Sequence, residues 1–418
     1  MRRAALILSA LPGLTWSATT RADPPTGYVS AVASEPDLEP FAAQVVDSVR
    51  AELERGGHLA LAAAEARVHG LEAETSSDLD RARGLYAAGR EAYDDLELTE
   101  AVTKLTRAIA LFDTHLRALD DFDVYVDALL RLGAARVLNG NARDADAAFV
   151  RVYTLAPQRT PDPEIYPSEV VTRFAETVAR ARRAGSGALE VQSEPAGAWV
   201  YVDGSLRGRA PVRVDDMAAG SHVVRVRSPG FADRAAAASV RARRSESLTL
   251  ELEPVDGMQE VPSLVSRLSI DVPGGTVEEL GRAIEVSRVV LLVFSAGPEG
   301  EVALDVRRYD VGSGAAPVRR TASLSQDAVG VEEVVRLALE VVRAQAGEVQ
   351  TRVRVSNHLP PPPPPPATRG GITTRWWFWT GVGAVVVGGV VLTVALASSG
   401  GGRPRGDGSM GEVVMSFR

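Results

Sequence analysis

The length, composition and charge of the chain exclude several classes of protein. It has 418 residues, of which 45% are hydrophobic, and a formal net charge of -8. A chain of this length holds about two to four domains. It has no cysteine, which excludes disulfides, thiolate metal sites and cysteine nucleophiles. A phosphate footprint requires a basic stripe, and the sequence has none, so we expect no nucleic-acid partner.

Residues 1–22 have the layout of a secretory signal peptide. Arg2 and Arg3 precede an apolar run, and small residues follow around Ala18 and Ala22. The run is too short to span a bilayer, so we expect cleavage after Ala22 or Ala18. The body of the chain would then lie outside the cytoplasmic membrane.

Residues 23–79 form a short acidic segment that is either helical or α/β. Its apolar residues recur at helical spacing, which predicts one amphipathic helix. The residues before and after this helix leave a β-α-β start open. The helix is predicted from Phe41, Val45, Val46, Val49 and Leu53.

Residues 80–184 predict a helical domain in which one pattern occurs twice, from Ala82 and from Val126. Small residues at matching offsets let the two helices of a hairpin touch, and larger ones fill the gap. The pattern resembles the tetratricopeptide repeat (TPR), with residues 113–125 inserted between its copies. The matching positions are Leu85, Gly89, Ala101, Leu105 and Ala108 in the first copy and Leu129, Gly133, Ala145, Phe149 and Val152 in the second.

The segment 168–178 predicts a helix that covers the open end of the repeats. Ser168 is placed to cap its N-terminus. A change in polarity at residues 184–187 predicts a hinge after this helix. Its apolar stripe consists of Val170, Val171, Phe174 and Val178.

The resemblance to TPR repeats implies a concave face on the first helix. Arg83, Tyr86, Arg90 and Tyr93 would lie on that face. Arginines between tyrosines would hold an extended, acidic peptide, so these four residues form a candidate peptide site.

Residues 188–254 alternate apolar and polar residues, which predicts five strands with one buried face each. Asp203 and Gly204 fit a tight hairpin turn, because glycine easily adopts positive φ. The strands are predicted around Leu189 and Val191, around Ala198, Val200 and Val202, around Val212 and Val214, around Val224 and Val226, and around Leu248, Leu250 and Leu252.

The same segment carries a specific motif, S-x-P-x-G-A-x-V-x-V-D-G, from Ser193 to Gly204. Pro211 and a Pro-Gly-Phe triplet that ends at Phe231 follow it in order. This series resembles the PEGA domain, a small β-sandwich of surface and envelope proteins. Ala196 departs from the pattern, since it replaces the glutamate of the family name.

Trp199 and Tyr201 lie on the face of their predicted strand opposite to Val200. Aromatic rings on such a face either stack on a sugar or peptide ligand or pack against a neighbouring domain. The sequence leaves both interpretations open.

Residues 263–348 predict a small α/β domain in the order strand, helix, buried strand, two further strands and helix. One arrangement is that residues 28–68 complete the sheet of this domain. The helical and β modules would then be inserted between its two parts.

The remaining residues predict a membrane anchor. Residues 355–375 contain seven consecutive prolines and predict a semi-rigid stalk. Residues 376–397 carry no charge and are long enough for a transmembrane helix, and residues 398–418 form a flexible tail. With a cleaved signal peptide the body lies in the periplasm or outside, and the alternative is a tail-anchored protein with a cytoplasmic body. Small residues on one face of the span favour self-association between helices, namely Gly381, Ala384, Gly388 and Ala395.

The sequence contains no recognisable catalytic constellation. The five histidines are dispersed without metal-ligand spacing, and no P-loop, G-x-S-x-G elbow or zinc-protease signature is present. The PEGA resemblance implies a structural role for His222. We therefore expect no enzymatic activity, no cofactor and no metal.

The fold class we predict is multidomain: α-helical TPR-like repeats, a PEGA β-sandwich, a small α/β domain and a single transmembrane helix. Our first hypothesis is a non-enzymatic, membrane-anchored envelope scaffold that binds envelope proteins or peptides through its TPR-like and PEGA modules. The alternative is a protein that binds envelope glycan or cell wall through the PEGA module. An enzyme in residues 263–348 is a third hypothesis, which rests on fold class alone.

Overall fold

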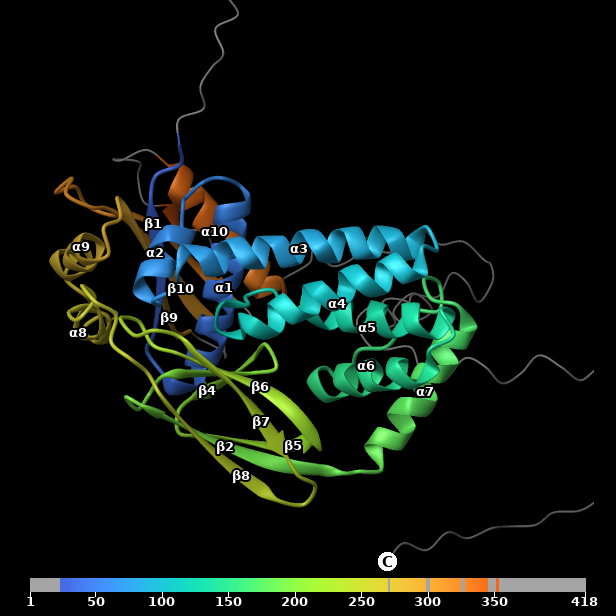
Figure 1. Ribbon diagram of the computed structural model, residues 1–418. Helices are drawn as coiled ribbons and strands as arrows, with labels where there is room; N and C mark the ends of the chain where they lie inside the picture. The colour runs from blue at the N-terminus through green and yellow to red at the C-terminus, as the bar shows by residue number, and fades with distance from the viewer. Residues whose placement is uncertain (1–22, 270, 298–300, 325–327, 345–350, 353–418) are drawn as a thin grey trace, which may run out of the picture. The chain divides into compact units, whose positions relative to one another are not determined.

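A computed structural model describes residues 23–269, 271–297, 301–324, 328–344 and 351–352 (Figure 1). The predicted signal peptide, stalk, transmembrane helix and tail lie outside these residues. Within the described ranges, no helix has both the length and the apolar character needed to cross a membrane.

A five-stranded sheet combines segments from opposite ends of the described chain. β1 pairs with β9 in parallel, with Gly27 opposite Arg288, so residues 28–68 do help to complete this sheet as the sequence suggested. The strand order is β1-β9-β10-β11-β12. The strands are β1 (Gly27–Ala33), β9 (Arg288–Ala296), β10 (Val302–Asp310), β11 (Val318–Leu324) and β12 (Thr351–Arg352).

Helices cover both faces of this sheet, which we call the α/β module. On one face, α1 buries Val45, Val49 and Leu53, which confirms the amphipathic helix predicted around them. On the other face, the sequence predicted a strand from Ser263, and this was wrong: a short helix forms there, with Pro262 in its first turn. The helices are α1 (Glu39–Arg55) and α10 (Ala328–Arg343) on the first face and α2 (Ala62–Val68), α8 (Val261–Ser266) and α9 (Gly274–Ala283) on the second.

Five consecutive α-helices form the helical region. A Cβ atom added to Gly89 would lie 2.8 Å from Leu105, and one added to Gly133 would clash with Phe149. In both predicted copies the glycine therefore contacts the larger residue that the pattern places opposite it. Because glycine has no side chain, the paired helices approach each other closely. The helices are α3 (Ala73–Asp94), α4 (Leu98–Thr114), α5 (Phe122–Leu138), α6 (Ala142–Leu155) and α7 (Ser168–Arg182).

Helix α7 covers the end of this region. Val170, Phe174 and Val178 are buried, as predicted, and Phe174 packs edge-on against Phe149. The predicted cap was wrong: Pro167 occupies the N-cap position in an extended conformation, and Ser168 is the first residue of the helix.

Residues 186–251 form a β-sandwich of two sheets, ordered β5-β2-β8 and β4-β3-β6-β7. The prediction of five strands missed β4, which has few apolar residues, and β7, which is rich in alanine. The hairpin turn is confirmed, since Asp203 and Gly204 have φ of 51° and 75°. The predicted hinge overlaps β2, which begins at Ser186. The strands are β2 (Ser186–Glu194), β3 (Trp199–Val202), β4 (Ser205–Arg209), β5 (Val212–Ala218), β6 (Gly220–Arg227), β7 (Arg234–Val240) and β8 (Ser245–Glu251).

Candidate functional site

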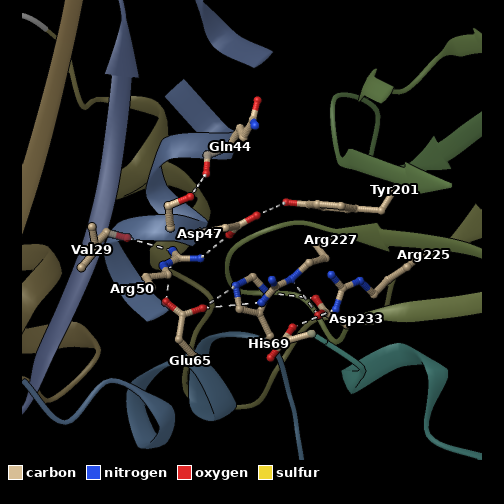
Figure 2. A network of polar contacts seen from close by, with 12 residues as sticks. Val29, Gln44, Asp47, Arg50, Glu65, His69, Tyr201, Arg225, Arg227 and Asp233 are labelled. Atoms are coloured by element: carbon tan, nitrogen blue, oxygen red, sulfur yellow. Dashed lines mark hydrogen bonds and ion pairs between the residues drawn. The ribbon is translucent and has the colours of Figure 1, made fainter. Parts of the chain in front are cut away.

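The β-sandwich meets the α/β module at the outer face of the sheet β4-β3-β6-β7. Tyr201 on β3 donates its hydroxyl to the carboxylate of Asp47 on α1, over 3.5 Å (Figure 2). Arg209 on β4 donates through Nε to Glu39 at the start of α1, over 2.5 Å. Helix α1 thus contacts a sheet face that would otherwise be open to ligands.

Behind these contacts lies a group of charged side chains. The Nε atom of Arg227 lies 2.9 Å from Asp233, and its Nη2 atom lies 3.5 Å from Glu65. His69 lies between the same two carboxylates, 2.9 Å from Asp233 and 3.6 Å from Glu65. Arg50 on α1 approaches Glu65 to 3.0 Å. We call Arg50, Glu65, His69, Arg227 and Asp233 the junction network (Figure 2).

The junction network holds its charges in a buried environment. Burial by itself would lower the pKa of Arg227, but the charges of Asp233 and Glu65 raise it above its usual range. Burial opposes ionisation of Asp233, yet the charge of Arg227 keeps the pKa of Asp233 below its usual range. Burial also raises the pKa of Tyr28, whose ring faces Arg50, to about 12. Arg227 and Asp233 are therefore an ionised pair at neutral pH.

Backbone contacts tie the same two parts of the chain together. The amide of Gly230 donates to the carbonyl oxygen of Val68, and the amide of Asp233 donates to that of His69, each over 3.0 Å. Gly70, which follows His69, has φ of 59°, and a Cβ atom there would approach Ala232 to 3.0 Å. Both the backbone and the side chains therefore fix the β-sandwich against the residues after α2.

The β-sandwich also contacts the helical region. Arg225 on β6 lies 3.0 Å from the carboxylate of Asp120 and donates to the carbonyl oxygen of Leu119. Arg151 on α6 donates to the carbonyl oxygen of Ser221, over 3.2 Å. Asp120 thus helps to join two modules.

The β-sandwich, with its two sheets and its glycine turn, matches a known protein family. Residues 186–256 match the PEGA domain. The match covers the β-sandwich and leaves out the helical region and most of the α/β module. A search of curated proteins finds no match to the chain.

The two aromatic residues singled out in the PEGA domain both face the α/β module. Tyr201 is buried, contacts Asp47, and has the guanidinium of Arg225 4.9 Å from its ring centroid. Trp199 is half-buried, and the guanidinium of Arg209 lies 3.9 Å from its ring centroid. One face of the indole is therefore occupied by a side chain of the PEGA domain itself.

A cavity of about 490 Å³ lies beside these residues. This volume is in the range of small-molecule and peptide-side-chain pockets. Its walls come from β1, α1, α8 and the PEGA domain, and they include Trp199, Tyr201 and Arg209. The candidate functional site is this cavity together with the junction network.

The predicted peptide site on α3 is divided between the surface and the core. Arg90 is exposed, and Arg83 is half-buried beside Asp80. The hydroxyl of Tyr86 donates to Asp127 on α5, over 2.7 Å. Tyr93 is buried, and its ring packs against that of Tyr166, so it is not on an open surface. These contacts leave the two arginines as the more accessible members of the site.

Sequence reasoning missed the junction network because its members are far apart in the chain. One signal was available: Arg225 and Arg227 interrupt a strand whose neighbouring residues are apolar and buried. A charge in such a strand requires a partner from another element. His222, by contrast, is structural as implied, since its Nδ1 lies 2.5 Å from Asp203. Among the described residues, no group of His, Asp and Glu is arranged to hold a metal ion.

Proposed function

We propose that the chain is a non-enzymatic, membrane-anchored envelope scaffold, in which the PEGA domain joins two partner-binding modules. The observation that carries this proposal is the contact of α1 with the PEGA sheet face through Tyr201 and Arg209. A domain whose aromatic face is packed against its own chain acts as an internal joint. The buried ion pairs behind that face favour one fixed arrangement of the modules.

The membrane topology that we propose rests on the predicted signal peptide, residues 1–22, and the predicted transmembrane helix, residues 376–397. Protease treatment of spheroplasts tests it, because a body outside the cytoplasmic membrane is digested while a cytoplasmic body is protected. A membrane-impermeable protease should therefore remove the described region from intact spheroplasts. Protection until the cells are lysed would contradict this topology and support a tail-anchored protein.

Crosslinking followed by mass spectrometry tests the scaffold itself. A photoreactive residue at position 90 on α3 lies on an exposed surface, and we expect it to capture a small set of proteins reproducibly. The matched control is a photoreactive residue at position 249, an exposed position of β8 in the other sheet of the PEGA domain. Equal capture at both positions, or capture of none, would contradict a partner-binding role for the helical region.

Binding of glycan is a second candidate function, favoured by the position of Trp199 in the cavity wall. Retention of the full-length chain on purified cell wall, abolished by Trp199→Ala, would support it. Tyr153→Ala on α6 is the control, since that ring lies outside the cavity. The scaffold proposal predicts no retention that depends on Trp199.

A further inference from the structure

Strand β1 forms one edge of the five-stranded sheet. The carbonyl oxygen of Thr26 accepts from Arg288, and the amide of Ser34 donates to Phe294, so both point toward β9. Backbone groups of alternate residues in a strand point to the same side. The backbone groups of Ala31 and Ala33 therefore point away from β9.

The chain itself occupies only the first part of this outer edge. The amide of Gly27 donates to Ala60, over 3.0 Å, and the carbonyl oxygen of Val29 accepts from Arg50, over 2.8 Å. Further along, Ala31 and Ala33 are half-buried and line the cavity. Within the part of the chain that the structure describes, their backbone groups on this side have no hydrogen-bond partner. An edge of this kind is a template for an added strand.

The walls of the cavity show which side chains such a strand would carry. On α1, Ala43 and Val46 are apolar, whereas Glu39, Asp47 and Arg50 are charged. Val265 on α8 and Leu268 just after it form a second, apolar wall. Successive side chains of an extended peptide point to opposite faces, so they would meet these two walls in turn. The apolar parts of these walls fit small or medium apolar side chains.

The wall opposite β1 comes from the PEGA domain, and its charges are already paired. Arg209 is paired with Glu39, and Arg227 is paired with Asp233. The charges that α1 adds to the cavity are also paired, since Arg50 lies 3.6 Å from Asp47 and 3.0 Å from Glu65. A charged side chain entering here would find no free opposite charge, and its desolvation would be unfavourable. An uncharged segment therefore fits the cavity best.

We propose that this cavity binds an extended, uncharged peptide segment of a partner protein, which adds as a strand to β1 at Ala31 and Ala33. The inference rests on the proposed scaffold function and names where and how one partner binds. Main-chain hydrogen bonds supply affinity in this mode, and the apolar walls supply specificity.

Selection of eight-residue peptides from a random phage-displayed library against the full-length chain tests the proposal. We expect enriched sequences that are apolar and uncharged over at least four consecutive positions. A selected peptide, labelled with a fluorophore, should then bind in a polarisation assay. Enrichment of charged sequences, or no enrichment, would overturn the proposal.

Two variants separate strand addition from other binding. Ala31→Pro removes the amide donor that faces the cavity and leaves the opposite pairing with β9 in place, because proline is tolerated on edge strands. Ala43→Phe fills the cavity from α1 without changing β1. Each should weaken the selected peptide at least tenfold while the far-ultraviolet circular dichroism is unchanged. Gln44→Phe, at an exposed position of the same helix, is the matched control and should bind as the unaltered chain does.

The outcomes distinguish the failure of this inference from failure of the scaffold function. Binding unchanged by both Ala31→Pro and Ala43→Phe would overturn the inference while crosslinks from position 90 could persist. Loss of those crosslinks would count against the scaffold and not against the peptide site. An N-methyl group on alternate amides of the selected peptide gives a further check: only one of the two alternating patterns should abolish binding.

Discussion

The PEGA domain has two interfaces, and they are built by different means. Toward the α/β module it uses buried charges, with Arg227 and Asp233 at the centre. Toward the helical region, Arg225 pairs with the exposed Asp120 and Gly204 packs closely, since a Cβ atom on Gly204 would lie 2.5 Å from Phe122. The first interface depends most on a set of buried charge partners, whereas the second depends most on the absence of a side chain at Gly204. The two sides of one domain are thus fixed mainly by different physical means.

The largest effect should come from breaking the charged interface. Asp233→Asn leaves Arg227 buried without its carboxylate, which should lower the free energy of unfolding by about 3–5 kcal/mol. Urea denaturation followed by circular dichroism measures this change. Arg234→Ala, which removes an exposed pair with Glu253 3.8 Å away, is the control and should cost less than about 1 kcal/mol. Equal effects of the two substitutions would show that the network is not the basis of this interface.

The glycine interface should be the next most sensitive. Gly204→Ala combines a strained positive φ with a clash against Phe122, and should cost about 2–4 kcal/mol. Gly257→Ala is the matched control, because that glycine has φ of 79° and open space around it. It should cost only the strain, about 1–2 kcal/mol. If both substitutions cost the same in urea denaturation, Phe122 does not restrict this side of the domain.

A buried histidine inside the PEGA domain, His222, should make the stability depend on pH near neutrality. Burial lowers the pKa of His222, but its hydrogen bond with Asp203 raises that pKa above the usual value of 6.5. A raised folded pKa stabilises the chain below the unfolded pKa, and this contribution is lost as the pH rises through the folded pKa. His222→Gln should therefore cost most, about 1–3 kcal/mol, below pH 6.5 and less as the pH rises above that value. A difference in melting temperature that stays constant from pH 5.5 to 8.5 would contradict this account.

The smallest effect is expected at the rim of the charged interface. Arg209 and Glu39 form a partly exposed pair, so Arg209→Ala should cost less than about 1 kcal/mol, including the loss of its contact with Trp199. High salt should reduce this small difference further. A cost as large as that of Asp233→Asn would contradict this account, because it would show that the Arg209–Glu39 pair stabilises the interface as much as the buried Arg227–Asp233 pair does.

Local patterns of the fold could be predicted from the sequence, whereas the joint between modules could not. The turn at Asp203 and the contact of Gly89 with Leu105 follow from spacing and from the properties of glycine. Strand β7 was missed because a run of alanines shows no alternation of apolar and polar residues. Glu65 and Asp233 were missed because only the folded chain brings them to Arg227, so no short-range pattern marks them.

Native-state hydrogen exchange of the full-length chain tests most directly whether the PEGA domain is a fixed joint. The amides of Gly230 and Asp233 donate across the interface to Val68 and His69. The account predicts that both are protected as strongly as the amides of β6, and that Asp233→Asn speeds their exchange at least about 100-fold. Exchange of both amides within seconds in the unaltered chain, while β6 stays protected, would contradict it.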